Sequence, residues 1–212
     1  MPLRPHFSRN RGPALGGDLI EYNDVLEFWF GDPNGHGFGQ HREAWFAKDD
    51  AFDAEIRTRF GKDVARASAG RYDFWEISPL GTLALIVMLD QFPRNIFRGL
   101  PKAFAADAKA RSIARRAIDR GIDQALPSVQ RMFIYLPFEH SENLADQRKC
   151  IALYSEILPC FEVEFSEKAC FSVYRHCEII ERYGRFPHRN EVIGRESSAE
   201  ELEFLKEAHS SF

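Results

Sequence analysis

Apolar residues in this chain recur at the spacing of an α-helix. Phe52, Ile56, Phe60 and Val64 lie four residues apart, with acidic and basic residues between them. That period places one apolar stripe along an amphipathic helix, whereas a half-buried strand would alternate apolar and polar residues. No segment of the chain alternates in this way. The sequence therefore predicts an all-α fold.

Capping residues and glycines indicate where the helices begin and end. Ser78 and Pro79 open the segment LGTLALIVMLDQF, which is apolar almost all round and is expected to form the buried central helix. Pro93 is expected to end this helix, because the residue before a proline disfavours the α conformation. One helix is expected to begin at Asn23, and others are expected to span 103–120, 128–136, 142–158 and 167–183. Each of the last three is opened by a serine. A final helix is expected to begin at Ser198, with Glu201 completing a capping box. The pattern predicts roughly seven to nine helices joined by short turns.

Length and composition favour one globular unit. The chain has 212 residues, of which 44% are hydrophobic and 28% charged, so it can bury a core. Its 19 phenylalanines predict a core filled by large flat side chains. We expect residues 18–212 to form a single helical domain. Residues 1–17 carry arginines but no acid and no apolar h-region, so they are expected to be a mobile tail, not a secretory signal.

Charge and cysteine content exclude several classes of protein. The formal net charge of −4 argues against a nucleic-acid partner. The 4 cysteines form no CxxC pair, which fits a reduced, cytoplasmic protein without a disulfide framework. The longest apolar stretch, from Leu83 to Leu89, is far shorter than a membrane span. No cofactor or metal is expected, and nothing in the sequence sets the oligomeric state.

Three polar strings interrupt the helical pattern: 90–95 (DQFPRN), 137–142 (PFEHSE) and 185–190 (RFPHRN). The first and third share the spelling Phe-Pro-x-Arg-Asn, in which a proline is expected to end a helix and to place an arginine and an asparagine at its exit. The N–H donors of the guanidinium and the amide can together bind a carboxylate or a phosphate. The candidate ligand-binding residues are Gln91, Arg94, Asn95, Arg98, Glu142, His188, Arg189, Asn190 and Arg195. The alternative is structural, with the arginines binding helix carbonyls or pairing with nearby carboxylates.

His140 is the candidate catalytic base. It lies between two glutamates in sequence, and a neighbouring carboxylate can tune a histidine for acid–base chemistry, with Glu139 and Asp90 as candidate partners. No GxSxG, HExxH or glycine-rich phosphate loop accompanies it. The alternative for His140 is a histidine at a helix entry that is bonded only to its neighbours. A metal site with His176 and His188 is not expected, because the spacing of metal ligands is absent.

Longer strings resemble a known family. LDQFPRNIFRG is followed by AFAAD, then by YLPFEHSE with LADQ, then by RYGRFPHRN with GRESSAEE, and VLEFWFGD stands near residue 25. In this order they resemble the bacterial family called domain of unknown function 924, over all but the N-terminal tail. The resemblance implies a tetratricopeptide-like α-α superhelix with irregular repeats. It implies no established reaction.

These observations support one functional hypothesis with two alternatives. The first is the binding of a small anionic ligand, a carboxylate or a phosphate, in a groove lined by arginine, asparagine and histidine. The second is a protein or peptide interaction scaffold of the tetratricopeptide type. The third is a hydrolase that uses a histidine and a carboxylate.

Overall fold

The computed structural model describes residues 19–35 and 40–212, and this part of the chain is helical with no β-strand. The all-α fold expected from the helical spacing is confirmed. The expected tail, residues 1–17, lies outside the described residues. The α-helices are α1 Tyr22–Phe30, α2 Asp50–Ser68, α3 Pro79–Ile86, α4 Phe92–Ile96, α5 Asp107–Asp119, α6 Ser128–Glu139, α7 Leu144–Ile157, α8 Val163–Tyr183 and α9 Ala199–Phe204.

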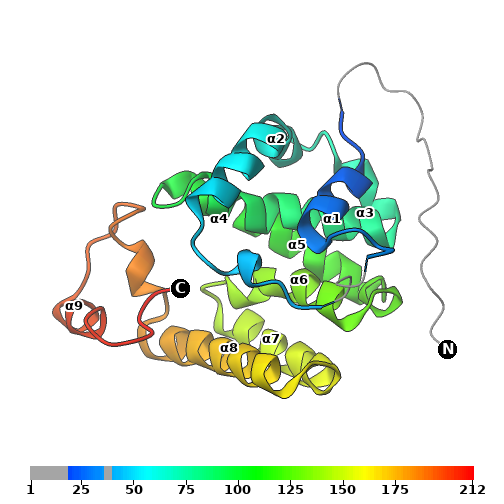
Figure 1. The fold of residues 1–212 in the computed structure, drawn as a ribbon. Helices are drawn as coiled ribbons and strands as arrows, with labels where there is room; N and C mark the ends of the chain where they lie inside the picture. Colours follow the sequence, from blue (N-terminus) through cyan, green and yellow to red (C-terminus); the bar gives the residue numbers. More distant parts are fainter. Residues whose placement is uncertain (1–18, 36–39) are drawn as a thin grey trace.

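Helices that follow one another along the chain pack side by side in the second half of the fold. α5 packs on α6, α6 on α7 and α7 on α8, while α9 lies beyond the C-terminal end of α8 (Figure 1). In the first half, α1 packs on α3 and α2 on α4. α3 also contacts α5 and α6, and its residues from Gly81 to Ile86 are all buried. The expectation that this segment forms the buried central helix is therefore confirmed.

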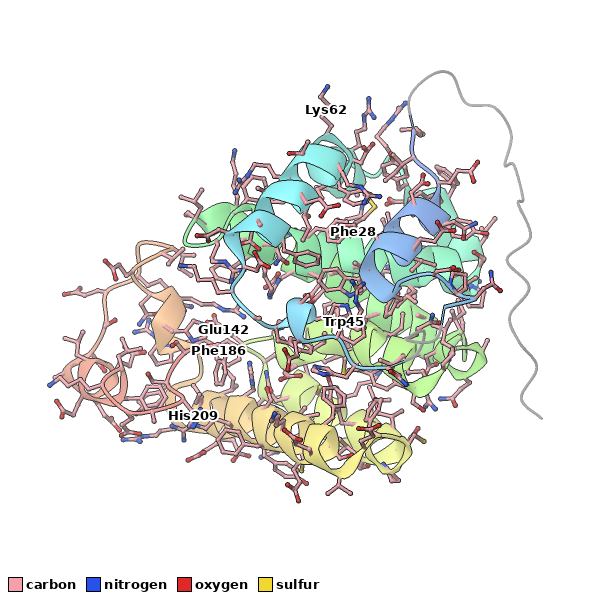
Figure 2. The ribbon with its side chains drawn as sticks, in the orientation of Figure 1. Phe28, Trp45, Lys62, Glu142, Phe186 and His209 are labelled. Carbon is pink, nitrogen blue, oxygen red and sulfur yellow. The ribbon has the colours of Figure 1, made fainter. Side chains whose placement is uncertain are left out.

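Aromatic rings fill the core where α1, α2, α4 and α6 meet. The Trp29 ring has no exposed surface and contacts the rings of Trp45, Phe52, Phe92 and Phe133. Trp45, labelled in Figure 2, donates its indole N–H to the carbonyl of Trp29 at 2.7 Å. Aromatic pairs of this kind contribute about 0.5–1.5 kcal/mol beyond the burial of their surface. The high phenylalanine content therefore serves packing, as expected.

A smaller core holds the C-terminal part of the chain. Ile179 and Ile180 of α8 pack with Phe186 and with Phe204 of α9, separately from the main cluster. The segment that carries the third polar string lies between these two helices. Its position therefore depends on packing at the end of α8.

Two helix starts agree with the expected caps. The Ser78 hydroxyl accepts the N–H of Gly81 at 3.1 Å, with Pro79 at the first helical position. Ser198 and Glu201 form a reciprocal capping box at the start of α9. α8 ends at Gly184, whose φ of 68° is the left-handed conformation that favours glycine.

Other expected caps are wrong. Asn143, not a serine, accepts the first N–H groups of α7. Ser166 lies inside α8, which begins at Val163, and Ser128 is the first residue of α6 and makes no capping bond. α1 begins at Tyr22, so Asn23 is inside the helix. Several residues near each start can cap, and the tertiary contacts of the preceding turn decide between them.

Pro93 does not end the central helix, contrary to expectation. A π-helical turn at Val87–Gln91 joins α3 directly to α4, and the N–H of Phe92 donates to the carbonyl of Val87, five residues back. The wider turn lets the chain continue through the proline, which removes only its own N–H. Pro187 likewise does not end a helix, because it opens the 3-10 turn Pro187–Arg189 after α8 has ended at Tyr183.

Candidate functional site

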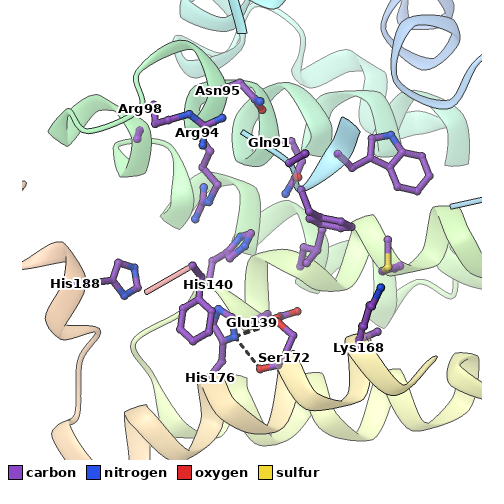
Figure 3. A pocket seen from close by; sticks show the side chains of 18 of the residues that line it. Gln91, Arg94, Asn95, Arg98, Glu139, His140, Lys168, Ser172, His176 and His188 are labelled. Atoms are coloured by element: carbon purple, nitrogen blue, oxygen red, sulfur yellow. Dashed lines mark hydrogen bonds and ion pairs between the residues drawn. The ribbon is translucent and has the colours of Figure 1, made fainter. Parts of the chain in front are cut away.

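A cavity of about 660 Å³ lies where α4, α6, α8 and the C-terminal segment face one another (Figure 3). Its volume is within the range of roughly 300–1,000 Å³ that is typical of small-molecule sites. Its apolar wall includes Trp45, Phe46, Phe104, Met132, Leu136 and Phe165. Its polar wall includes Gln91, Arg94, Asn95, Arg98, Glu139, His140, Ser172, His176, His188 and Arg189. The structure thus brings residues of all three polar strings to one cavity.

His140 and Asp90 form a buried pair at this cavity. Nδ1 of His140 lies 2.8 Å from Oδ1 of Asp90, whose side chain is fully buried. The other Asp90 oxygen accepts the amide of Gln91 at 2.6 Å, and the Arg94 guanidinium lies 3.5 Å from Oδ1. Burial by itself raises the pKa of Asp90, but the neighbouring Arg94 guanidinium and the contact with His140 outweigh it and hold that pKa well below its usual range. Asp90 is therefore an anion behind the cavity wall.

The end of α6 is held in place from α7. His140 is the residue that follows the last turn of α6. The side-chain amide of Gln147 donates to the carbonyls of Glu139 at 2.6 Å and Ser141 at 2.7 Å. These bonds satisfy carbonyls that a helix end leaves without partners. The backbone that carries Glu139 and His140 is fixed as a result.

Two arginines meet at Asp107, but they bind it unequally. Arg94 donates from Nη1 at 2.8 Å and from Nη2 at 3.0 Å, one bond to each oxygen of Asp107. Nη1 of Arg189 lies 3.5 Å from one of those oxygens, and Nη2 donates to the carbonyl of His140 at 3.1 Å. The guanidinium of Arg189 lies between the rings of Phe104 and Phe186, at 4.6 and 4.7 Å from their centres. Burial and the nearby charge of Arg94 lower the pKa of Arg189 to about 10, so it stays charged at neutral pH.

The pKa of Glu139 is shifted in the opposite direction to that of Asp90. Its side chain is buried and accepts the hydroxyl of Ser172 at 2.7 Å. His176 lies 3.2 Å away (Figure 3), but its Nδ1 also meets the carbonyl of Ser172 at 2.8 Å. Burial lowers the pKa of His176 to about 3, so this histidine is neutral and does not balance a charge on Glu139. Burial accordingly raises the pKa of Glu139.

His188 is a second neutral histidine on the cavity wall. Burial and the charge of Arg189 lower its pKa to about 3. Its Nδ1 is buried and has no hydrogen-bond partner among the residues that the structure describes.

Asn95 and Arg98 line the cavity, yet both are bound to Asp53 of α2. The amide of Asn95 donates to Asp53 at 2.7 Å, and the guanidinium of Arg98 donates at 2.9 and 3.0 Å. Burial raises the pKa of Asp53, but the Arg98 and Asn95 hydrogen bonds outweigh that effect and lower it. These contacts are the ones that the structural alternative expects, and ligand binding by Asn95 and Arg98 stays a prediction.

Glu142, Asn190 and Arg195 do not line the cavity. Arg195 donates to both oxygens of Glu142 at 2.7 and 2.8 Å, and Glu142 also accepts the N–H of Phe186 at 2.8 Å. The amide of Asn190 donates to Ser197 at 3.0 Å. These contacts tie the C-terminal segment to the turn after α6, so they position His188 and Arg189.

Sequence reasoning missed Asp53, Asp107, Gln147 and Ser172 as members of the site or its support. Asp107 belongs to the AFAAD string and Gln147 to the LADQ string. Both strings contribute to the family resemblance. No local pattern in the sequence connects Asp107 to an arginine or Gln147 to the end of another helix.

Within residues 19–35 and 40–212, no group of three or more histidine, cysteine, aspartate or glutamate side chains is arranged to hold a metal ion. No helix in the same part of the chain is long and apolar enough to cross a membrane.

Comparisons with known proteins identify the family of this chain. Residues 25–209 match the family described as bacterial protein of unknown function (DUF924). The fold is similar to the structure of ATU0120, a protein of unknown function from Agrobacterium tumefaciens, with a TM-score of 0.75 and 37% identity. That similarity covers 87% of this chain and 96% of the other. No curated protein matches the sequence. The chain belongs to the DUF924 family of bacterial proteins.

Proposed function

We propose that the cavity binds a small ligand with an apolar body and an anionic end, a carboxylate or a phosphate, and that Arg189 holds the anion. The proposal depends on the different contacts that Arg94 and Arg189 make with Asp107. Arg94 takes both oxygens of that carboxylate, whereas Nε of Arg189 has no hydrogen-bond partner among the described residues. A buried guanidinium with an unused donor is costly unless an acceptor reaches it. Arg189 lines the cavity, so an anionic ligand that displaces the side chains covering Nε supplies that acceptor.

The surroundings of Arg189 support an anion with an apolar body. Its side chain is only 9% exposed, and the flanking rings of Phe104 and Phe186 fix the plane of the guanidinium. A fixed planar fork matches the geometry of a carboxylate or a phosphate. Trp45, Phe46 and other apolar residues of the wall can cover the rest of the ligand.

The same geometry favours a small ligand over the scaffold alternative. The charged groups converge on one cavity whose volume fits a small molecule, whereas a peptide scaffold would present its contacts along an extended face. The superhelix expected from the family resemblance remains a prediction.

Calorimetric titration of the full chain tests the proposal. The ligands are phenylacetate, octanoate and phenyl phosphate, with phenylacetamide as the uncharged match of the first. We expect an anion to bind and the amide to bind at least about tenfold more weakly, which corresponds to about 1.4 kcal/mol. Arg189→Gln should abolish the preference for the anion.

Arg182→Gln is the matched control, because Arg182 pairs with Glu200 on the surface of α8, with 49% of its side chain exposed. This variant should bind as the wild type does. Equal affinity for phenylacetate and phenylacetamide, or full binding by the Arg189→Gln chain, would refute the proposal.

A further inference from the structure

His140 and Glu139 line the same cavity wall at the end of α6, and Asp90 of the π-helical turn lies behind that wall in contact with His140. We infer that they make the cavity hydrolytic: Nε2 of His140 takes a proton from a water molecule that attacks an ester of the bound anion, and Glu139 protonates the departing oxygen. The inference rests on the proposed function, because Arg189 would hold the anionic end of the substrate. The substrate class is a small carboxylate that carries an ester.

The contact with Asp90 sets which nitrogen of His140 carries the proton. An ionised carboxylate only accepts hydrogen bonds, so the Nδ1 atom 2.8 Å from Asp90 must be the N–H. In the neutral ring this leaves the lone pair on Nε2. Asp90 thereby orients the ring and stabilises the cation that forms when Nε2 takes a proton.

Nε2 of His140 is open to the cavity. No described residue hydrogen-bonds to it, while 15% of the side chain is exposed and the residue lines the cavity wall. A water molecule between Nε2 and a bound ligand would therefore meet an unoccupied acceptor.

Burial favours the protonated form of Glu139, because it raises the pKa of this carboxyl and outweighs the opposite effects of His140, Ser172 and Tyr154. The side chain is buried, its neighbour His176 is neutral, and the hydroxyl of Ser172 donates to it. Ser172 is thereby engaged, so water and not a serine is the nucleophile in this scheme. Two adjacent groups with opposite tendencies form an acid–base pair.

The atoms and protons of this reaction balance with water as the only co-reactant. An O–H bond of water breaks, the proton goes to Nε2, and the oxygen bonds to the ester carbonyl carbon. The C–O bond of the ester then breaks, and the departing oxygen takes the proton of Glu139. His140 afterwards returns its proton to Glu139, and the new carboxylic acid releases one proton to solvent.

Steady-state kinetics with two probes separate the roles of the two residues. The probes are the mono-4-nitrophenyl and monobenzyl esters of glutarate, which share one carboxylate. 4-Nitrophenolate leaves without protonation, whereas the benzyl oxygen needs an acid. His140→Asn should lower kcat about 100-fold on both esters, the range of general-base contributions. The side-chain amide of the asparagine in this variant can still donate a hydrogen bond to Asp90, which preserves the buried contact. Glu139→Gln should lower kcat to a similar degree on the benzyl ester only.

The controls distinguish a failed mechanism from a failed site. His209→Asn removes an exposed imidazole and should leave both rates unchanged; asparagine also accepts the φ of 58° at this position. If the wild-type chain binds phenylacetate but hydrolyses neither ester, the hydrolytic inference is wrong and the binding proposal stands. If phenylacetate does not bind, the binding proposal itself fails. A His140→Asn rate equal to the wild-type rate would likewise overturn the inference.

Discussion

Nδ1 of His140 lies 2.8 Å from Oδ1 of Asp90, although the two residues are 50 positions apart in the sequence. The contact joins the end of α6 to the π-helical turn that connects α3 with α4. Both partners belong to polar strings that the sequence marks as unusual. Their pairing turns two separate strings into one side of a single cavity.

Removing the charge of Arg94 should cost much of the stability of the protein. Arg94 binds both oxygens of Asp107 and lies 3.5 Å from the fully buried Asp90, so Arg94→Met leaves Asp107 with only the longer Arg189 contact and Asp90 with only His140 and Gln91. Loss of one partner of a buried ion pair costs about 3–5 kcal/mol. Urea unfolding at pH 7 measures the change. The surface variant Arg182→Gln serves as the control, and an equal unfolding midpoint for both variants would contradict the prediction.

His176 should make the protein less stable as the pH falls. Its pKa is lowered to about 3 in the folded chain, against an ordinary value of 6.5. Between these values the unfolded chain binds a proton that the folded chain does not, so stability is full above pH 6.5 and is lost on acidification. The slope is about 1.4 kcal/mol per pH unit for this one group. Urea unfolding from pH 4 to pH 6 should show a shallower slope for His176→Asn, in which the amide can replace Nδ1. Parallel slopes would show that His176 titrates normally.

Phe212 should restrict the size of ligand that the cavity accepts. Its ring stacks on His176 with 3.8 Å between ring centres, and it lines the cavity. Phe212→Ala removes this ring and opens space beside His188. The affinity for naphthylacetate should rise roughly tenfold, as expected if about 50 Å² more of the ligand's apolar surface is buried. Phenylacetate, which needs less space, should gain less. Calorimetric titration measures both, and a uniform loss of affinity would mean that Phe212 helps to bind the ligand.

Gly81 should tolerate no side chain, in contrast to Gly61. A Cβ atom at Gly81 would lie 2.4 Å from the backbone carbonyl oxygen of Trp75, so Gly81→Ala forces the start of α3 to move. Overpacking of this kind costs about 1–3 kcal/mol. A Cβ atom at Gly61 of α2 meets only the side chain of Arg57 at 3.9 Å. Gly61→Ala should therefore stabilise the chain by about 0.4–1 kcal/mol. The unfolding temperatures of the two variants, measured against the wild type, test this prediction. Equal shifts of the same sign would contradict the close packing at Gly81.

The features predicted well from sequence depend on residues that are close along the chain. Ser78 and Ser198 cap the helices that they were expected to cap, and Gly184 ends α8. A cap is a contact between a side chain and an N–H group two or three residues away, so its signal is local. The four-residue apolar spacing of α2 is local in the same sense.

The features that the sequence predicted wrongly or missed depend on distant partners. Pro93 was expected to end a helix, but the π-helical turn and the packing of α4 against α2 carry the helix through it. Asn95 and Arg98 were candidate ligand-binding residues, yet Asp53, more than forty residues earlier, already binds them. Nothing near these residues in sequence reveals that carboxylate.

The sequence by itself determined the helical class, some helix boundaries such as Ser78, Ser198 and Gly184, and the polar strings that line the candidate site. The tertiary structure decided which arginine at the cavity wall has an unused donor, which nitrogen of His140 is open, and which histidines are neutral. The physical reason is that helix formation follows short-range spacing, whereas charge and proton occupancy follow burial and the nearest opposite charge. In this chain those charges come from helices far apart in sequence, so folding alone brings them together.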